Sequence, residues 1–172
     1  QAVQIELISA MPAELERRLL QDQLQLAIGY FSGNQNALDH QLLFSEQQTL
    51  NCAASHPLFS QPVITREELD RCDHVQHAYR SISIHQPLQA SLSSARCEQV
   101  EGSLAFILSG AHIGYLPEHI AAPWVANGRL SALLPEQLGF NVDFHLTSHR
   151  GRHPGDAQLA FVEDMLGAFG PA

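Results

Sequence analysis

The chain has 172 residues, enough for one ordinary domain or two small lobes around a substantial core. Nine Lys and Arg residues against 18 Asp and Glu residues give a formal net charge of −9, and such a chain repels phosphate backbones, so we do not expect this segment to bind DNA or RNA by itself. No apolar run is long enough to span a bilayer, and we see no signal peptide, that is, no basic segment followed by an apolar one, at the start of the sequence. The three cysteines are not closely paired in the sequence, which favours a cytoplasmic protein over a secreted disulfide scaffold.

The first part of the chain predicts a strand, a helix and a second strand. Residues 3–8 alternate between apolar and polar side chains, which is typical of a strand. Pro12 opens a predicted helix whose leucines form one buried stripe up to Leu20. Residues 24–31 are apolar on both faces around their centre, as in a central strand of a parallel sheet.

The middle of the chain predicts several short elements. Residues 42–46 and 49–54 read as two strands, and Thr65 begins a capping box ahead of a short helix to about Cys72. Residues 73–78 predict a strand. The segment 82–96 is ambiguous, with one strand suggested around Leu88.

Residues 100–117 form the most informative stretch. Residues 100–109 have the apolar spacing of a buried helix face, Gly110 suits a left-handed helix end, and residues 113–116 make a short apolar strand. Gly114 lies between apolar neighbours, which indicates that either another chain segment or a ligand approaches the backbone closely there.

The remaining residues continue the alternation of helices and strands. Pro123 predicts a break in a helix that runs toward Gly128, because proline has no N–H to donate. We expect strands at 130–134 and 142–146, a linker at 135–139 and an amphipathic helix at 157–169. The fold class is therefore α/β.

The order of motifs resembles the effector-binding domain of LysR-type transcriptional regulators. Four segments carry the resemblance with similar gaps and span nearly the whole chain: ELERRLLQDQLQLAIGYF, LLFSEQQTLNCAASHPLF, VEGSLAFILSGAHIGYLPEHIAAPWVANGRLSALLP and FHLTSHRGRHPGDAQLAFVEDML.

The resemblance implies two Rossmann-like lobes similar to those of type 2 periplasmic binding proteins. Residues 1–78 with 140–172 would form lobe I and residues 79–139 lobe II. The first strand–helix unit of lobe I, on the order of 20–30 residues, is missing from the pattern. We expect the missing unit to leave either an exposed sheet edge or a space that another molecule fills.

The resemblance also implies where a small effector is held, between strand ends and helix N-termini of the lobes. The corresponding residues are Ser9, Ala10, Met11, Gly29, Tyr30, Phe31, Tyr79, Arg80, Ser81, Ile113, Gly114 and Tyr115. Arg80 suits bidentate capture of a carboxylate, or it pairs with an acidic residue of the chain. Ser9 could instead cap its helix, and Tyr30 and Phe31 could be packing residues.

Histidines and nucleophiles give no catalytic or metal motif. Ten histidines include the neighbours His74 and His77 and the spaced set His145, His149 and His153, yet neither set predicts converging ligands, so we expect solvent-facing histidines. Ser109 with His112, and Ser55 with His56, lack a third orienting group. We therefore expect no enzyme activity, no cofactor and no metal.

The leading hypothesis is the ligand-sensing half of a bacterial transcription regulator. Its expected partners are a small-molecule effector (a carboxylate among the candidates), a second copy in a homodimer or a tetramer at full length, and DNA only through an absent N-terminal winged helix-turn-helix domain. Residues 3–8 and 100–109 fall where family dimer contacts lie. Two alternatives stay open: a stand-alone solute-binding protein, or an enzyme on the same scaffold.

Overall fold

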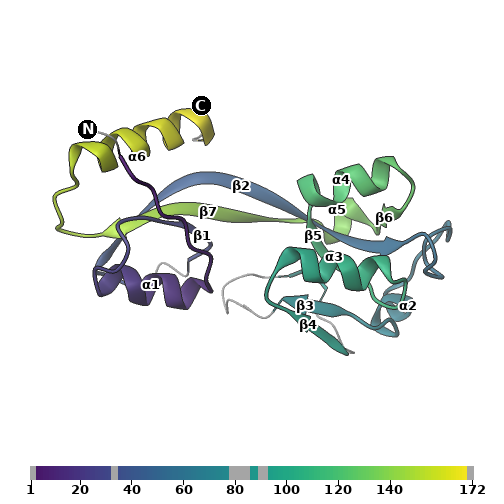
Figure 1. Ribbon diagram of the computed structural model, residues 1–172. Coiled ribbons are helices and arrows are strands. Elements are labelled where there is room, and N and C mark those ends of the chain that lie inside the picture. Colours follow the sequence, from purple (N-terminus) through teal and green to yellow (C-terminus); the bar gives the residue numbers. More distant parts are fainter. Residues whose placement is uncertain (1–2, 32–34, 78–85, 89–92, 170–172) are drawn as a thin grey trace. The chain divides into compact units, whose positions relative to one another are not determined.

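The computed structural model describes residues 3–31, 35–77, 86–88 and 93–169 (Figure 1). The helices are α1 (Pro12–Leu20), α2 (Arg66–Asp70), α3 (Val100–Leu108), α4 (Glu118–Ala126), α5 (Pro135–Leu138) and α6 (Asp156–Phe169). The strands are β1 (Ala27–Gly29), β2 (Leu38–Ala53), β3 (Val75–His77), β4 (Ala95–Cys97), β5 (Gly114–Pro117), β6 (Leu130–Ala132) and β7 (Phe140–His149). The fold is mixed α/β, as predicted. No helix in this described part is long and apolar enough to cross a membrane.

Contacts divide the chain into two units. Unit 1 consists of Gln1–Ser45 with Asp143–Ala172, and unit 2 of Glu46–Val142. The lobe boundaries that the sequence predicts, at residues 78/79 and 139/140, stay predictions. β2 is one continuous strand, and its last residues pair with strands of unit 2.

Unit 1 is built on β1, β7 and the first half of β2. β1 pairs antiparallel with β7, with Ala27 opposite Thr147 and Gly29 opposite His145, and β7 is the hydrogen-bonded neighbour of β2. α1 packs against β1, and its Leu19 joins Phe31 and Leu38 in the buried core of this unit. Pro12 occupies the first turn of α1, as predicted.

Two sequence predictions for unit 1 are wrong. Residues 3–8 form no strand: Val3, Ile5 and Leu7 are 63%, 66% and 93% exposed, because no described strand pairs with this segment. Residues 24–31 supply only the three-residue β1, which is antiparallel to its neighbour and exposes Ile28, so it is not a central parallel strand.

Unit 2 contains the second half of β2, paired antiparallel with β5 and β6, and a separate parallel pair of β3 and β4. α3 packs on β3, β4 and β5, and α4 packs on β5 and β6 (Figure 1). Two buried apolar clusters stabilise the unit, one around Leu50 and Tyr115 and the other around Ile107 and Leu116.

Several predicted elements of unit 2 are confirmed. α3, β3, β5 and β6 lie where the sequence placed them, and Gly110 adopts a left-handed φ of 80° after α3. Thr65 caps α2 with a complete capping box, in which its hydroxyl accepts from the Glu68 N–H and the Glu68 carboxylate accepts from the Thr65 N–H.

Other predictions for the later elements need correction. The two strands expected at 42–46 and 49–54 are one strand, β2, and α4 continues through Pro123 as a single helix. The expected linker at 135–139 contains the short helix α5, whose Leu138 is buried in the core. Leu88 lies in a bend with its side chain in the core, and β4 was not predicted.

The cap of α2 gives a direct test of this local structure. Thr65→Ala removes the side-chain acceptor from the first turn, and we expect unfolding to become easier by about 1 kcal/mol. Thr65→Ser keeps a hydroxyl in the same place and is the matched control. Urea denaturation measures both variants, and an equal loss for Ala and Ser would contradict the capping role.

Candidate functional site

The residues before α1 are the first predicted contact set. Ser9 is exposed, whereas Ala10 and Met11 are half-buried. Met11, not Ser9, is the N-cap, and its carbonyl accepts the N–H groups of Glu14 at 2.9 Å and Leu15 at 3.0 Å. The alternative in which Ser9 caps this helix is therefore wrong, and the Ser9 hydroxyl lies at the surface.

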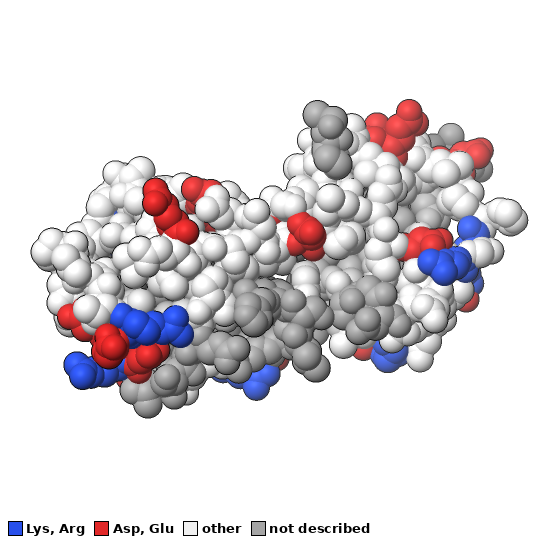
Figure 2. Space-filling view, turned by 180° about the vertical axis from the view of Figure 1, so that it is seen from behind, with Lys and Arg blue, Asp and Glu red and all other residues white. Residues whose placement is uncertain are grey.

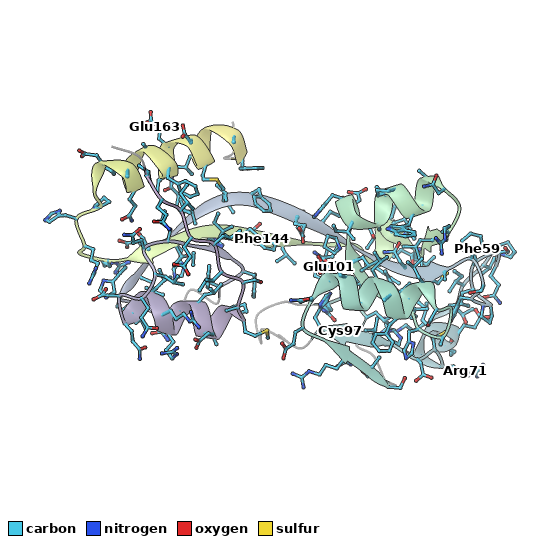
Figure 3. All side chains as sticks on the ribbon, viewed as in Figure 1. Phe59, Arg71, Cys97, Glu101, Phe144 and Glu163 are labelled. Atoms are coloured by element: carbon cyan, nitrogen blue, oxygen red, sulfur yellow. The ribbon has the colours of Figure 1, made fainter. Side chains whose placement is uncertain are left out.

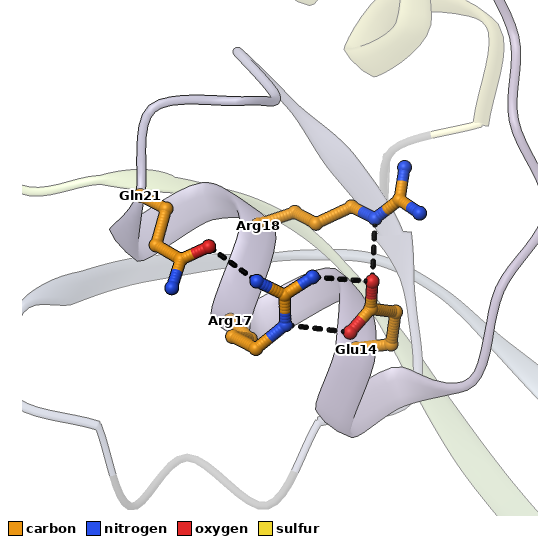
Figure 4. Close-up of polar contacts among 4 residues, drawn as sticks. All are labelled: Glu14, Arg17, Arg18 and Gln21. Atoms are coloured by element: carbon orange, nitrogen blue, oxygen red, sulfur yellow. Dashed lines mark hydrogen bonds and ion pairs between the residues drawn. The ribbon is translucent and has the colours of Figure 1, made fainter.

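The exposed face of α1 carries a polar network (Figure 4). Glu14 accepts from Arg17 at 2.7 and 2.6 Å and from Arg18 at 2.7 Å, and Arg17 also contacts Gln21. The hydrogen bonds from Arg17 and Arg18 lower the pKa of Glu14 to about 2. These arginines already share a carboxylate of their own helix, and exposed pairs of this kind contribute little to stability.

The second set, Gly29 to Phe31, ends β1. Phe31 is 5% exposed and packs in the core of unit 1, with its ring 5.8 Å from the His40 ring. Of the two alternatives considered for Phe31, packing is therefore what its side chain does. Tyr30 is half-buried, and Gly29 is buried opposite His145.

The third set, Ile113 to Tyr115, lies in unit 2. Ile113 is fully buried and Tyr115 is 7% exposed. A Cβ on Gly114 would lie 2.6 Å from Cγ1 of Val75 and 3.1 Å from Cδ1 of Ile107. The close approach that the sequence indicated at Gly114 therefore comes from β3 and α3, that is, from other segments of the chain.

The remaining predicted contacts, Tyr79, Arg80 and Ser81, lie outside the described residues and stay predictions. The structure thus brings the sets at 9–11 and 29–31 into unit 1 and places the set at 113–115 in unit 2.

The histidines are not uniformly solvent-facing, contrary to the prediction. His56 and His74 are 8% and 4% exposed, and burial lowers the pKa of both. The His56 ring accepts from the Leu58 N–H at 3.2 Å, and the His74 ring lies 3.2 Å from the Leu69 carbonyl. Within the described ranges, no group of three or more His, Cys, Asp and Glu residues could hold a metal ion.

The side chains of Ser109 and His112 have different hydrogen-bond partners. Ser109 donates to the Phe106 carbonyl at 2.6 Å, while His112 contacts Ser94 at 2.9 Å.

The three cysteines are free thiols. Cys97 lies near the first turn of α3 (Figure 3), and its Sγ would be 3.2 Å from a Cβ built on Gly102. Burial raises the pKa of the Cys52 thiol to about 11, which disfavours its reactive thiolate.

Comparisons with known proteins identify relatives of this sequence. The family model described as LysR substrate binding domain matches residues 1–170. The chain is 32% identical over 164 residues to the HTH-type transcriptional activator BauR of Pseudomonas aeruginosa. That match covers 94% of this chain and 54% of the relative, so the chain spans about half the length of this curated protein.

Solved structures share the fold at low sequence identity. The regulatory domain of CcmR from Synechocystis PCC6803, in complex with 2-PG, has a TM-score of 0.71 at 12% identity, covering 92% of this chain and 79% of that one. The effector binding domain of QuiR, in complex with shikimate, has a TM-score of 0.70 at 16% identity, covering 91% and 77%. The fold is therefore that of LysR effector-binding domains, which resembles type 2 periplasmic binding proteins.

The packing around Gly114 predicts the outcome of a substitution. Gly114→Ala places a methyl group against Val75 and Ile107, and we expect a loss of about 1–3 kcal/mol in the free energy of unfolding. Gly167→Ala is the control, because a Cβ there meets nothing within 4 Å and the residue lies inside α6. Chemical denaturation should show a loss for the first variant and none for the second. An unchanged Gly114→Ala protein would contradict the close approach.

Proposed function

The chain belongs to the LysR substrate-binding domain family, and we propose that it senses a small-molecule effector for a transcription regulator whose DNA-reading element lies elsewhere in the full-length protein. The family match over residues 1–170 carries this proposal. The name of the relative BauR, an HTH-type transcriptional activator, supports it. The comparisons give no support to a stand-alone solute-binding protein or to an enzyme.

The charge of the chain supports a separation of effector sensing from DNA binding. With a net charge of −9, this segment repels nucleic acid phosphates. On the face drawn in Figure 2, the blue Lys and Arg side chains form small separate groups, several of them beside red carboxylates. Binding to DNA therefore needs a different, basic part of the full-length protein.

We assign the effector contacts to the half-exposed and exposed residues of the predicted sets. Side chains that are partly or fully exposed to solvent belong to Ser9, Ala10, Met11 and Tyr30. Phe31 is buried in the core of unit 1, and Ile113 and Tyr115 are buried in unit 2. QuiR is described in complex with shikimate, a carboxylate, and this observation favours a small carboxylate as the effector here.

A thermal-shift screen tests the proposal. We expect shikimate or another small carboxylate to raise the melting temperature of the chain, since ligand at a hundredfold excess over Kd adds about 2.7 kcal/mol of stability. The methyl ester of each active compound is the matched control, because it lacks the charge and should bind more weakly. Shifts that appear equally with the esters would contradict a carboxylate effector.

A variant pair locates the charge that receives the carboxylate. Arg80→Gln should weaken binding of the active carboxylate by tenfold or more, because a bidentate, charge-assisted contact contributes about 1.5–3 kcal/mol. Arg71→Gln, at an exposed arginine of unit 2 (Figure 3), should leave binding unchanged. Isothermal titration calorimetry measures both, and equal affinities would remove Arg80 from the site.

We further propose that the protein is a homodimer. Two surfaces predicted for the contact carry exposed apolar side chains: Val3, Ile5 and Leu7 before α1, and Phe106 on α3, which is 40% exposed. Contiguous exposed apolar patches on a protein surface mark sites of protein–protein interaction, whereas single exposed apolar side chains are common.

Sedimentation velocity tests the dimer. Ile5→Asp should shift the protein toward monomer, whereas Val63→Asp should not, because Val63 is a 73% exposed valine outside both predicted surfaces. A wild-type chain that stays monomeric at high concentration, or a dimer unaffected by Ile5→Asp, would contradict the proposed contact.

A further inference from the structure

Polar side chains of β2 and β7 meet beside the core of unit 1. Nδ1 of His40, on β2, lies 2.9 Å from Oγ1 of Thr147, on β7. The His145 ring, also on β7, stands edge-on to the His40 ring, with 6.1 Å between the centroids. Glu16 of α1 is close enough to influence the charge of His40. We call Glu16, His40, His145 and Thr147 the histidine cluster.

The histidine cluster is incompletely hydrogen-bonded. Oε1 of Glu16, Nε2 of His40 and Nδ1 of His145 are all buried, and among the described residues none of them has a hydrogen-bond partner. Thr147 is fully buried. Buried polar atoms are nearly always paired in folded proteins, so three unpaired atoms in one cluster need a reason of their own.

The surroundings favour the neutral form of His40. Burial lowers its pKa, and the neighbouring His145 lowers it further. Glu16 and Asp39 act in the opposite direction, while Arg150 acts with His145. Asp39 is itself bound by Arg150 at 2.6 Å, so part of its charge is already compensated. The apolar Phe31 ring lies 5.8 Å from the His40 ring, measured between the ring centroids.

We propose that the histidine cluster is a proton-responsive site, in which neutral His40 joins β2 to β7 and protonated His40 loosens this contact. The neutral ring needs one donor and one acceptor, and the Thr147 hydroxyl satisfies Nδ1 in either role. The protonated ring carries a second N–H and a charge, next to His145 and against Phe31. Acid would thus weaken the packing of β2 and β7 in unit 1, independently of any effector.

The sign of the pH effect follows from the direction of the pKa shift. A histidine whose pKa is lower in the folded chain than the ordinary value of about 6.5 binds protons more readily when unfolded. Its contribution to stability is complete above about pH 6.5 and is lost as the pH falls below that value. Acidification should therefore destabilise the chain through His40.

Urea denaturation of the full chain at about pH 7.5 and about pH 5.5 tests the proposal. His40→Gln keeps a polar group near Thr147 but does not titrate, so the loss of stability between the two pH values should be smaller than in the wild type. His153→Gln removes an exposed histidine of the same unit and should leave that loss unchanged. The buried His56 and His74 contribute equally to all three proteins. Equal losses in His40→Gln and the wild type would overturn the proposal.

A residue-resolved measurement keeps the test valid if His40→Gln folds poorly. In the wild-type chain, NMR titration of the His40 ring should give a midpoint below about 6.5, and the Thr147 amide should shift with the same midpoint. A His40 midpoint at or above the ordinary value, or a Thr147 signal that does not follow it, would contradict the proposed site.

Discussion

The continuous strand β2 is the element on which both units depend. Leu38 and Leu43 at its beginning are buried in unit 1, whereas all residues from Gln48 to Ala53 are buried in unit 2. In the first half only Leu38 and Leu43 are fully buried, whereas every residue of the last part, from Gln48 to Ala53, is buried.

The sequence was informative wherever the structure is determined by neighbouring residues. The capping box at Thr65, the left-handed Gly110 and the proline that opens α1 are local signals, and each was found where it was predicted. Errors arose where partners are distant in the sequence. β4 exists because Ala95 pairs with Val75, and residues 3–8 lack a strand because no described partner pairs with them.

The same distinction applies to the candidate site. Gly114 was correctly identified as a point of close approach, yet a single sequence could not decide between a ligand and the Val75 side chain, because that contact depends on how β3 and α3 pack. The burial of Phe31 and Tyr115 likewise depends on tertiary packing. Likeness to a family indicates which positions face a ligand in general, whereas the packing of this chain determines which side chains remain accessible.

Burial alone does not distinguish the histidine cluster from the other buried histidines. His56 and His74 are more deeply buried than His40, but each has a backbone partner, Leu58 and Leu69. A histidine with a nearby backbone acceptor, such as the Leu69 carbonyl beside His74, keeps a favourable contact when it gains a proton. His40 has Thr147 at one ring nitrogen and no described partner at the other. A proton on His40 therefore adds a charge and a second donor together, whereas a proton on His56 would disrupt its hydrogen bond from the Leu58 N–H, so we expect acid to act on the fold at both histidines.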